Sequence, residues 1–574
     1  MTPPGLIAIQ RSDAAGHTAW VHFCNPLQVL TAHTLAEVQP VLAAAQSAAA
    51  RGLHAVGWIA FEAAPAFDAH LQTHPPQPGL PLARFSLFDR QHPGLPRPAE
   101  NDFSLDPWTP GLSPEAFAEA IRTIRAAIAA GETYQVNFTF PRHSLLHGSP
   151  WGLFQALRAG QTARHQAWID DGERILLCAS PELFFRLEGG QITCRPMKGT
   201  ARPGEAGPLS RSVKDQAENV MIVDMIRNDL GKAARPGSVQ VAQLFGIEAY
   251  PSLLQMTSTV TASGPADALP WLQALFPCAS ITGAPKRQTL EWIRRLETGP
   301  RGIYTGAIGG FYADGVTEFN VAIRTAVFNP ATGSLRYDSG CGIVWDSDPE
   351  AEYAESNLKA RIIESPAAPF SLIETCKWTP EAGCPLWPRH RARLLQSAAA
   401  LGHAVIPGEL DALMTDTFAR LSAPTRLRLL ADLDGGLSLT SAPLPATDAP
   451  LTFRLDTRPT PSDHPQLAHK TTRRGIYDAA RARCPDRDET LLLNEAGELM
   501  EFCIGSLVLL RNGRHLTPSL TSGLLPGVAR AEWIAQGRLT EAVLKPEDLH
   551  DAEGIFLLNA VRGLQPMRWL EAGP

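Results

Sequence analysis

Lysine is scarce in this chain, so each amine that remains is a candidate for chemistry. Of 51 basic residues only eight are lysine, and the other 43 are arginine. A guanidinium stays protonated, whereas a lysine amine can attack carbon or form a Schiff base once its pKa falls. Lys198 and Lys470, one in each half of the chain, are the candidates for such covalent catalysis. The alternative is that they are ordinary surface charges.

Carboxylates on two predicted helices form a second candidate set. One helix, near residues 212–230, carries Glu218, and another, at 349–364, carries Glu355 one turn before Lys359. Two carboxylates that meet from separate helices would suit Mg²⁺, which prefers oxygen ligands and keeps waters that a substrate anion can replace. The alternative for Glu355 and Lys359 is a surface ion pair of about 0.2–0.5 kcal/mol.

The elements that must position these groups divide the chain into two units. The first, residues 1–364, mixes strand-like runs, among them EFNVAIRTAVF, with helices and is an α+β unit. Its helices are predicted at 35–50, from Pro114 to Gly131, and near 151–159, 212–230, 284–297 and 349–364. Ten prolines from His74 to Pro114 predict a long loop there. Two prolines in residues 365–370 predict a linker, which is followed by a second unit at 371–574.

Composition excludes several classes of protein. With 44% hydrophobic residues among 574, the chain can build several cores, and its net charge of −7 provides no global positive field for nucleic acid. No run of 18 apolar residues occurs and the N-terminus does not resemble a signal peptide, so we expect no membrane segment and a cytoplasmic location. The nine cysteines lack metal-ligand spacing, which indicates reduced thiols and no zinc site.

An ordered series of motifs between residues 50 and 364 resembles the chorismate-utilising enzymes. The motifs are GWIAFE (57–62), AGETYQVN (130–137), SPE (180–182), RPMKGT (195–200), AENVMIVDMIRND (217–229), SITGAPK (280–286), YTGAIGGF (304–311), AIRT (322–325), GCGIVWDSDP (340–349) and EYAESNLKA (352–360). Within that family, lysine in the KGT motif marks aminodeoxychorismate synthase component I, whereas anthranilate synthase has alanine there. The resemblance therefore makes Lys198 the discriminating residue, and it implies a large chorismate-binding α/β sandwich domain.

The resemblance implies a role for each matched catalytic residue. Lys198 is expected to bond to C2 of the chorismate ring, and Glu182 to act as the general acid for the hydroxyl that leaves C4. Such an acid needs a raised pKa, and so a dry pocket. Glu218 and Glu355 are expected to hold the Mg²⁺ that binds the ring carboxylate.

The remaining matched residues are expected to bind the substrate. Arg324 and Tyr304 are implied partners of the enolpyruvyl carboxylate, Lys359 supplies local charge, and backbone amides line the anion at Gly283, Gly340 and Gly342. No cysteine stands in the Gly-x-Cys-x-Gly turn of a glutaminase, so a separate glutamine amidotransferase subunit is the expected source of ammonia.

Residues from about 370 to 568 resemble the fold type IV pyridoxal-phosphate enzymes, the class IV aminotransferase family, and most closely its aminodeoxychorismate lyase branch. The segments that carry this resemblance include LAHKTTRRGIYDAA, LLLNEAGELMEFCIGSLVLL, TPSLTSGLLPGVARAEWI and GIFLLNAVRGLQPM. It implies that Lys470 binds the cofactor covalently, that Arg393 clamps its phosphate and that Glu501 faces its pyridine nitrogen. The phosphate cradle is expected at Gly527, Val528, Ala529 and Asn559.

Two features of the second unit depart from that family. Ser506 stands where the family usually has Asn, and the first strands of the fold are absent before FSLIET. An alternative is therefore a unit that serves as a dimerisation scaffold, and a homodimer through this unit is one expectation.

The combined prediction is a fused enzyme of para-aminobenzoate synthesis. The first unit would convert chorismate to 4-amino-4-deoxychorismate, and the second would eliminate pyruvate to release 4-aminobenzoate. One rival is anthranilate synthase component I with an extension, and another is a catalytically silent chorismate-binding scaffold that holds the glutaminase.

Overall fold

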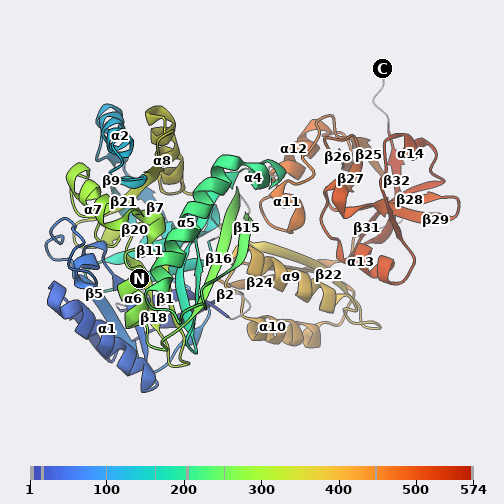
Figure 1. Ribbon diagram of the computed structural model, residues 1–574. Helices are drawn as coiled ribbons and strands as arrows, with labels where there is room; N and C mark the ends of the chain where they lie inside the picture. Colours follow the sequence, from blue (N-terminus) through green and yellow to red (C-terminus); the bar gives the residue numbers. More distant parts are fainter. Residues whose placement is uncertain are drawn as a thin grey trace. The chain divides into compact units, whose positions relative to one another are not determined.

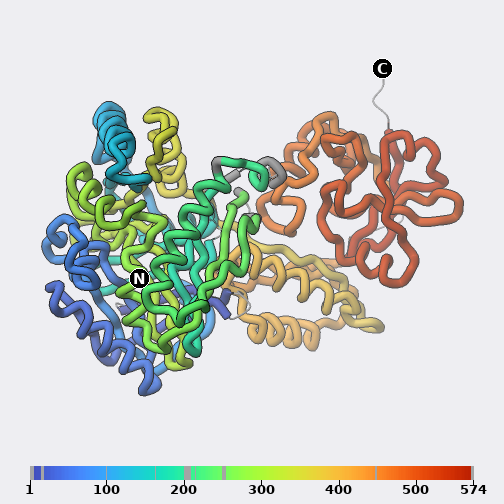
Figure 2. Tube along the Cα trace, viewed as in Figure 1, coloured from blue at the N-terminus to red at the C-terminus, as the bar shows by residue number. Residues whose placement is uncertain are grey.

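The computed structural model describes residues 5–13, 18–98, 100–161, 163–201, 206–250, 253–445 and 449–570. The described residues up to Ala368 form one compact unit, and those from Pro369 onward form the other. Figures 1 and 2 follow the chain from the blue start of the first unit to the red end of the second. Each unit is described separately below.

The first unit contains two large antiparallel sheets. The 11-stranded sheet has the order β17-β9-β21-β20-β11-β10-β1-β2-β6, with β7 and β8 also paired to β9. Its strands are β1 (Ile7–Ser12), β2 (Thr18–Phe23), β6 (His92–Pro93), β7 (Phe103–Leu105), β8 (Thr109–Pro110), β9 (Gln135–Gly148), β10 (His165–Asp170), β11 (Ile175–Ser180), β17 (Gly283–Ala284), β20 (Thr325–Asn329) and β21 (Ser334–Ile343).

The second sheet of this unit is 10-stranded, in the order β14-β16-β13-β12-β19-β18-β4-β5-β3, with β15 paired to β16. Its strands are β3 (Gln28–Ala32), β4 (His54–Ile59), β5 (Ala83–Phe88), β12 (Leu183–Glu188), β13 (Gln191–Arg195), β14 (Met197–Ala201), β15 (Gln240–Tyr250), β16 (Leu253–Ser263), β18 (Ala307–Phe311) and β19 (Thr317–Val321).

Strand β4 explains why the two sheets stack. All six of its residues are buried. Ala55 and Ile59 belong to a core shared with helices, whereas Val56 and Trp58 belong to a core shared with β1, β10 and β11 of the other sheet. Since successive side chains point to opposite faces, one face of the sheet is covered by helices and the other by its partner sheet. The predicted α/β sandwich is confirmed.

The predicted helices of the first unit begin within two residues of the expected positions, and local caps fix the first two of these starts, whereas the short helices Ala206–Arg211 and Leu269–Leu275 were not predicted. Thr34 and Glu37 form a capping box at the first helix, and the Ser113 hydroxyl accepts a hydrogen bond from the Ala116 amide at the second. The helices are α1 (Leu35–Ala50), α2 (Pro114–Ala129), α3 (Pro150–Gly160), α4 (Ala206–Arg211), α5 (Val213–Gly231), α6 (Leu269–Leu275), α7 (Lys286–Leu296) and α8 (Pro349–Glu364), with 3₁₀ turns η1 (Phe61–Ala66) and η2 (Ala279–Ile281).

Two segments differ from the expectation. The proline-rich stretch from residue 74 to 114 contains β5, which is paired on both sides, to β3 and β4. The run EFNVAIRTAVF is two strands in different sheets, β19 and β20, because the backbone turns between them and Arg324 adopts a φ of 51°. A positive φ at a residue other than glycine interrupts an extended strand.

The second unit contains a three-stranded and an eight-stranded sheet. The small sheet has the order β22-β23-β24, and the large one β27-β26-β25-β32-β31-β28-β29-β30. The strands are β22 (Leu372–Trp378), β23 (Thr425–Ala431), β24 (Leu437–Pro443), β25 (Leu451–Leu455), β26 (Glu489–Leu493), β27 (Leu499–Phe502), β28 (Gly505–Arg511), β29 (Arg514–Pro518), β30 (Thr540–Ala542), β31 (Gly554–Asn559) and β32 (Gly563–Trp569).

Helices of the second unit pack against both sheets. Helix α9 ends where Gly402 adopts a φ of 71°, a backbone conformation that glycine favours. The helices are α9 (Trp387–Leu401), α10 (Pro407–Arg420), α11 (Pro465–Ala468), α12 (Gly475–Arg483), α13 (Val528–Ala535) and α14 (Glu547–His550), with the 3₁₀ turn η3 (Leu520–Ser522). Among the described residues of the whole chain, no helix combines the length and apolar character needed to span a bilayer.

Candidate functional site

The first candidate site lies in the first unit, at two neighbouring places where the chain crosses from one sheet to the other. One crossing joins β11 to β12 and contains Glu182, and the other joins β19 to β20 and contains Arg324. The Val321 amide donates a hydrogen bond to the Glu182 carbonyl at 3.1 Å, and the Ala179 amide donates to the Arg324 carbonyl at 2.9 Å. These bonds hold the two crossings side by side, so both predicted residues lie at one junction.

Glu182 is buried without full compensation of its carboxyl group. Glu182 is 3% exposed, and its Oε1 atom accepts no hydrogen bond from any described residue. Burial raises the pKa of Glu182 to about 7, although a hydrogen bond from Ser280 and the charge of Lys198 act to lower it. A carboxyl group with such a pKa carries a proton near neutrality, which is the condition that a general acid requires.

Lys198 approaches this junction from β14. A methyl group added at Gly342 would lie 3.1 Å from the Lys198 amine and 2.4 Å from the Gln135 side-chain nitrogen. The amine of Lys198 is therefore placed against the backbone of β21 and acts electrostatically on Glu182. Gln135 is 1% exposed and its Oε1 accepts no hydrogen bond from the described residues. The structure thus brings Lys198, Glu182 and Gly342 together, beside a glutamine to which the sequence analysis gave no role.

Glycines allow the backbone to approach closely on this side of the site. Gly283 has a φ of +133°, and a methyl group there would lie 2.0 Å from the Gln135 carbonyl oxygen. At Gly340 a methyl group would lie 2.1 Å from the Phe138 carbonyl oxygen. Larger residues cannot replace these glycines unless β9 moves away from β17 and β21.

Arg324, Lys359 and Glu355 form a connected chain of contacts. The Arg324 guanidinium donates to the Lys359 carbonyl at 3.1 Å, and the Lys359 amine donates to the Gly340 carbonyl at 2.9 Å. The same amine pairs with the Glu355 carboxylate at 2.7 Å. The ion pair expected from the spacing is present, but its lysine is anchored on β21 and is not a simple surface charge.

A candidate metal-binding group lies beside α8. One ligand atom each of Cys341, Glu352 and Glu355 lies within 4.8 Å of the others. The two carboxylates match the oxygen preference of Mg²⁺, whereas the thiol does not. Glu218, which was predicted to share the metal with Glu355, lies on α5 and is not part of this group.

Tyr304 lies in a buried turn that the sequence analysis did not explain. Burial raises its pKa well above the usual range of a tyrosine. The turn is supported by Arg301, whose guanidinium pairs with Glu297 at 2.7 Å and donates to the Asn137 carbonyl at 2.7 Å. The Glu62 carboxylate accepts a hydrogen bond from the Arg301 backbone amide at 2.8 Å. Glu62 is the last residue of the GWIAFE motif, so the motif could have pointed to Glu62 as a residue that supports this turn.

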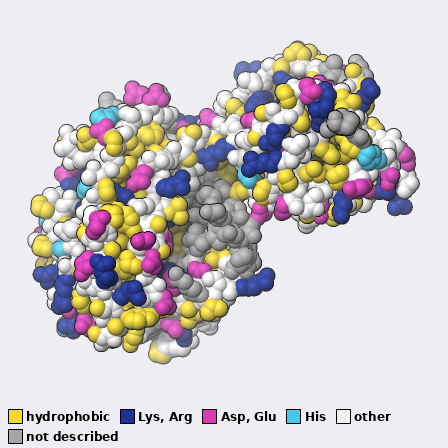
Figure 3. Space-filling view, turned by 90° about the horizontal axis from the view of Figure 1, so that it is seen from above, with side chains coloured by type: hydrophobic (Ala, Val, Ile, Leu, Met, Phe, Trp, Pro, Cys, Tyr) yellow, Lys and Arg dark blue, Asp and Glu magenta, His cyan; other side chains and the backbone are white. Residues whose placement is uncertain are grey.

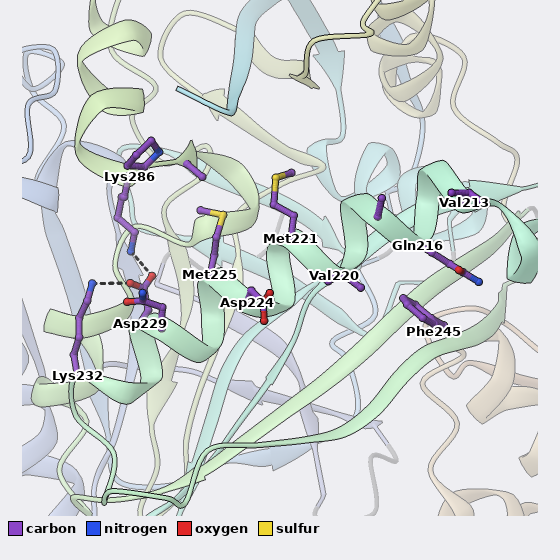
Figure 4. Close-up of a pocket in the computed structure, with 14 residues that line it drawn as sticks. Val213, Gln216, Val220, Met221, Asp224, Met225, Asp229, Lys232, Phe245 and Lys286 are labelled. Atoms are coloured by element: carbon purple, nitrogen blue, oxygen red, sulfur yellow. Dashed lines mark hydrogen bonds and ion pairs between the residues drawn. The ribbon is translucent and has the colours of Figure 1, made fainter. Parts of the chain in front are cut away.

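A separate cavity of about 940 Å³ follows one face of α5, and none of the predicted site residues lines it. Figure 4 shows Met221 and Met225 along this face, and at one end Asp229 joined to Lys232 and Lys286. Those ion pairs measure 2.7 and 2.8 Å. The chemistry predicted from the sequence therefore does not lie in this cavity.

The second candidate site is a cavity of about 300 Å³ in the second unit. Every residue predicted to bind pyridoxal phosphate lines it, although they come from distant parts of the chain: Arg393, Lys470, Glu501, Gly527, Val528, Ala529 and Asn559. The cavity also includes four residues from the small sheet that were not predicted: Ile373, Thr375, Arg426 and Arg428.

The lysine and the acid of this cavity both have perturbed pKa values. Burial lowers the pKa of Lys470 to about 8, with nearby Arg393 adding to the effect and Glu374 opposing it. Burial raises the pKa of Glu501 to about 7, although hydrogen bonds from the Leu525 amide and the Tyr477 hydroxyl favour the anion. These bonds measure 2.9 and 2.8 Å and fix the carboxyl group in place.

Arg393 is held by a buried network that the sequence analysis missed. Its guanidinium donates to both carboxylate oxygens of Glu374, at 2.9 and 2.7 Å, and to the Pro526 carbonyl at 3.1 Å. His390 contacts the same carboxylate at 2.6 Å. Burial alone would raise the pKa of Glu374, but the charges and hydrogen bonds of Arg393 and His390 outweigh it and lower that pKa to about 2. The network fixes the arginine at the wall of the cavity.

The predicted phosphate cradle begins at Gly527, the N-cap of α13. A methyl group at Gly527 would lie 2.9 Å from the Ser506 hydroxyl oxygen, so the serine that departs from the family pattern lies against this helix end. The side chain of Asn559 stabilises the turn after β31, since its oxygen accepts hydrogen bonds from the backbone amides of Val561 and Arg562 at 3.0 and 2.8 Å. Asn559 lies in the cavity wall, and these contacts show that it stabilises local structure.

Comparisons with known proteins agree with this division. Residues 9–365 match the chorismate binding enzyme family, and residues 371–569 match amino-transferase class IV. Aminodeoxychorismate synthase component 1 of Klebsiella aerogenes is 38% identical over 288 residues, which cover 48% of this chain and 62% of that protein. Anthranilate synthase component 1 of Streptomyces coelicolor is 37% identical over 273 residues, 45% of this chain and 53% of that protein.

The chain therefore spans less than two thirds of the length of each of these two synthase relatives. Among solved structures, anthranilate synthase component I of Streptococcus pneumoniae superposes with a TM-score of 0.54 at 22% identity, covering 63% of this chain and 93% of that one. This likeness supports the fold of the first unit. The chain belongs to the chorismate binding enzymes, and it continues into a unit of the class IV aminotransferase type.

Proposed function

We propose that this chain is a fused enzyme that makes 4-aminobenzoate from chorismate. The first unit would aminate chorismate to 4-amino-4-deoxychorismate, and the second would eliminate pyruvate from that product. The observation that carries the proposal is that Lys198 lies beside Gly342, where its charge acts on a buried, protonatable Glu182. A lysine at this position of the KGT motif favours the aminodeoxychorismate branch over anthranilate synthase, although relatives of both kinds match the chain.

In the first unit the reaction needs a nucleophile and an acid on the same ring. The Lys198 amine adds to C2 of chorismate while the C4 hydroxyl leaves, and Glu182 donates the proton that converts this leaving group to water. Ammonia then bonds to C4 and the C2–nitrogen bond to Lys198 breaks. Because Glu182 is buried, it keeps its proton until the hydroxyl departs.

Substrate carboxylates are proposed to bind at the sheet junction. Arg324 is half-buried there and can pair with one carboxylate. Tyr304 and the backbone near Gly283, Gly340 and Gly342 are proposed to bind the same substrate. Glu355 and Glu352 would hold Mg²⁺ through oxygen atoms, and the metal would bind the other carboxylate of the substrate. The part of Glu218 in this metal site remains a proposal.

In the second unit the lining residues fit pyridoxal phosphate. Bound there, the cofactor would withdraw electrons from the substrate carbon that loses a proton. Arg393 and the amides at the start of α13 would hold its phosphate, and Glu501 would hold a proton on its ring nitrogen. Lys470, with its pKa lowered to about 8, would bind the cofactor and, once released, move the proton of the substrate.

The partners follow from this chemistry. Chorismate is the proposed substrate, and a separate glutamine amidotransferase subunit is the proposed source of ammonia. We propose a cytoplasmic location and, as a secondary possibility for the second unit, a homodimer contact.

Product identification tests the proposal. Full-length protein incubated with chorismate, ammonium and Mg²⁺ should give 4-amino-4-deoxychorismate, and with added pyridoxal phosphate it should give 4-aminobenzoate and pyruvate. If 2-aminobenzoate is formed, the chain is an anthranilate synthase instead. Absence of any turnover with ammonium would favour the silent scaffold.

A further inference from the structure

Two cysteines of the second unit lie beside each other, and the proposed function uses neither of them. Cys376 is buried on β22, and Cys384 is partly exposed in the segment that leads into α9. All nine cysteines of the chain lie in the described residues as free thiols, and seven of them are buried. Cys384 and Cys24 are therefore the two thiols that a reagent in solution can reach.

A short loop connects the two cysteines. The backbone amides of Thr379 and Gly383 each donate a hydrogen bond to the carbonyl oxygen of the other residue, at 3.0 and 2.8 Å. Cys376 comes shortly before this closure, and Cys384 directly after it. The loop therefore returns the chain to the strand on which Cys376 lies.

The register of β22 turns Cys376 toward α9. Alternate residues of a strand share a face, so the Cys376 side chain lies on the same face as that of Glu374. Glu374 pairs with Arg393 of α9 at 2.7 Å, and α9 packs against β22. The segment that contains Cys384 enters the same helix, which begins at Trp387. Both thiols thus belong to the contact between β22 and the start of α9.

The two thiols share a hydrogen bond, which is the largest influence on the pKa of each. This bond and burial both raise the pKa of Cys376, whereas the bond lowers the pKa of Cys384 although burial opposes it. At Cys24, by contrast, burial raises the pKa. Because the thiolate is the nucleophile in disulfide exchange, Cys384 is the accessible thiol better suited to react first.

From this arrangement we propose that Cys376 and Cys384 form a reversible redox pair, which glutathione disulfide converts to an intramolecular disulfide. In the first step the Cys384 sulfur bonds to one sulfur of the reagent, and one glutathione leaves. In the second step the Cys376 sulfur bonds to Cys384, and the other glutathione leaves. The two cysteines lose two protons and two electrons, which the reagent gains as two glutathione thiols.

The charge near the pair favours this reagent. Glutathione disulfide is an anion at neutral pH, and Figure 3 shows Lys and Arg side chains gathered on one face of the second unit. Exposed Lys377 and Arg389 stand on either side of Cys384 in the sequence, with Glu381 as the one acidic residue between them. Such local positive charge attracts an anionic reagent.

The disulfide would tie β22 to the segment that enters α9. That helix carries His390 and Arg393, which both pair with Glu374 of β22. A covalent link at this contact restricts the unfolded chain, so the oxidised second unit should unfold at a higher temperature than the reduced one.

Peptide mapping of the full-length protein tests the redox pair. The protein is incubated with excess glutathione disulfide, quenched in acid, alkylated and digested with trypsin without reduction. Trypsin cleaves after Lys377, so the two cysteines fall on separate peptides that a disulfide keeps together. The variants are Cys376→Ser and Cys384→Ser, with Cys24→Ser as the matched control at the other accessible thiol.

We expect the unmodified protein and Cys24→Ser to give the linked peptides, which dithiothreitol separates. Cys376→Ser should stop at a mixed disulfide of Cys384 with glutathione, because the second thiol is missing. Cys384→Ser should leave Cys376 a free thiol, because Cys376 is buried. A mixed disulfide that persists on Cys384 in the unmodified protein, or a Cys384 that stays a free thiol, would overturn the pair.

Thermal unfolding of the same samples tests the effect on α9. The oxidised protein should unfold its second unit several degrees higher than the reduced protein, and Cys384→Ser should show no such difference. An equal midpoint despite linked peptides would keep the redox pair and contradict its effect on the helix. Neither measurement needs chorismate or pyridoxal phosphate, so this inference goes beyond the proposed function and is tested independently of it.

Discussion

The two units each bury a glutamate near a lysine for which we propose covalent chemistry, yet the two carboxyl groups differ in charge. In the first unit Glu182 has an oxygen without a partner, and burial raises its pKa to about 7. In the second, Glu374 is equally buried, but Arg393 and His390 outweigh that burial and lower its pKa to about 2. Burial therefore does not by itself determine the charge of a carboxyl group; the number of cations and donors in contact decides it. Glu182 is suited to donate a proton, and Glu374 to hold an arginine.

The lysines sharpen the same comparison. Lys198 lies close to the carboxyl group of Glu182, while Lys470 is surrounded by arginines that add to the effect of burial and help to lower its pKa to about 8. If both lysines act covalently, each unit should depend on its own amine and be indifferent to the other.

The largest expected effect is the loss of one reaction from each lysine variant. Lys198→Ala should reduce ammonia-dependent formation of 4-amino-4-deoxychorismate by roughly 10³-fold or more, because removal of a nucleophile removes the covalent step. Lys470→Ala should abolish the cofactor band and pyruvate release while amination continues. Separate assays of the two products check this, with Lys545→Ala, an exposed lysine, as the control. Amination at the normal rate in Lys198→Ala would remove the covalent step from the mechanism.

Glu182→Gln should lower the rate of the first reaction by about 10²–10⁴-fold, since the amide cannot donate the proton that the leaving hydroxyl needs. The unmodified enzyme should also lose activity as pH rises through about 7, where Glu182 loses its proton. A pH–rate profile of amination tests both statements, with the exposed Glu119→Gln on α2 as the control. If the amination rate of Glu182→Gln still falls as the pH rises through about 7, the loss of activity belongs to another group.

Much of this site could be predicted because it depends on short motifs. Lys198, Glu182 and Gly342 stand in segments that identify the family, and helix starts such as Ser113 follow from contacts within four residues. The strand β5 was missed because prolines dominate the segments on either side of it, whereas its own residues, ARFSLF, alternate between buried and half-buried positions over most of its length.

What could not be predicted depends on contacts between distant segments. The bond from Ser280 to Glu182 and the pairing of Glu374 with Arg393 join residues that the fold brings together. The positive φ of Arg324, which divides one predicted strand into two, has no signal in the hydrophobic pattern.

A smaller effect is expected on stability from the ionised glutamate. Glu374→Ala should destabilise the second unit by about 3–5 kcal/mol, because Arg393 and His390 would remain buried without their counter-charge. The pKa of Glu374 is lower in the folded chain than the unfolded value of about 4.3, so its contribution is complete above that value and is lost as pH falls through about 2.

Denaturant unfolding of the full-length protein measures this effect, followed through the transition of the second unit. Asp411→Ala, which breaks the more exposed ion pair with Arg391, serves as the matched control and should change the midpoint little. Similar midpoints for Glu374→Ala and Asp411→Ala would mean that the buried network contributes no more than a surface pair.

The smallest expected effect is a shift in the titration of Lys470. Burial is the main cause of its lowered pKa, and among the arginines that add to it Arg393 contributes more than Arg428. Arg428→Gln removes one positive charge near the amine, so the pKa of Lys470 should rise and less of it should be neutral at a given pH. The pH dependence of the rate at which cofactor-free protein binds pyridoxal phosphate should then move to higher pH. Arg514→Gln, at an exposed residue of β29 outside the cavity lining, leaves the cavity unchanged, so it should not move the midpoint of this pH dependence. If Arg428→Gln and Arg514→Gln have the same midpoint, burial and the paired arginines alone determine the pKa of Lys470.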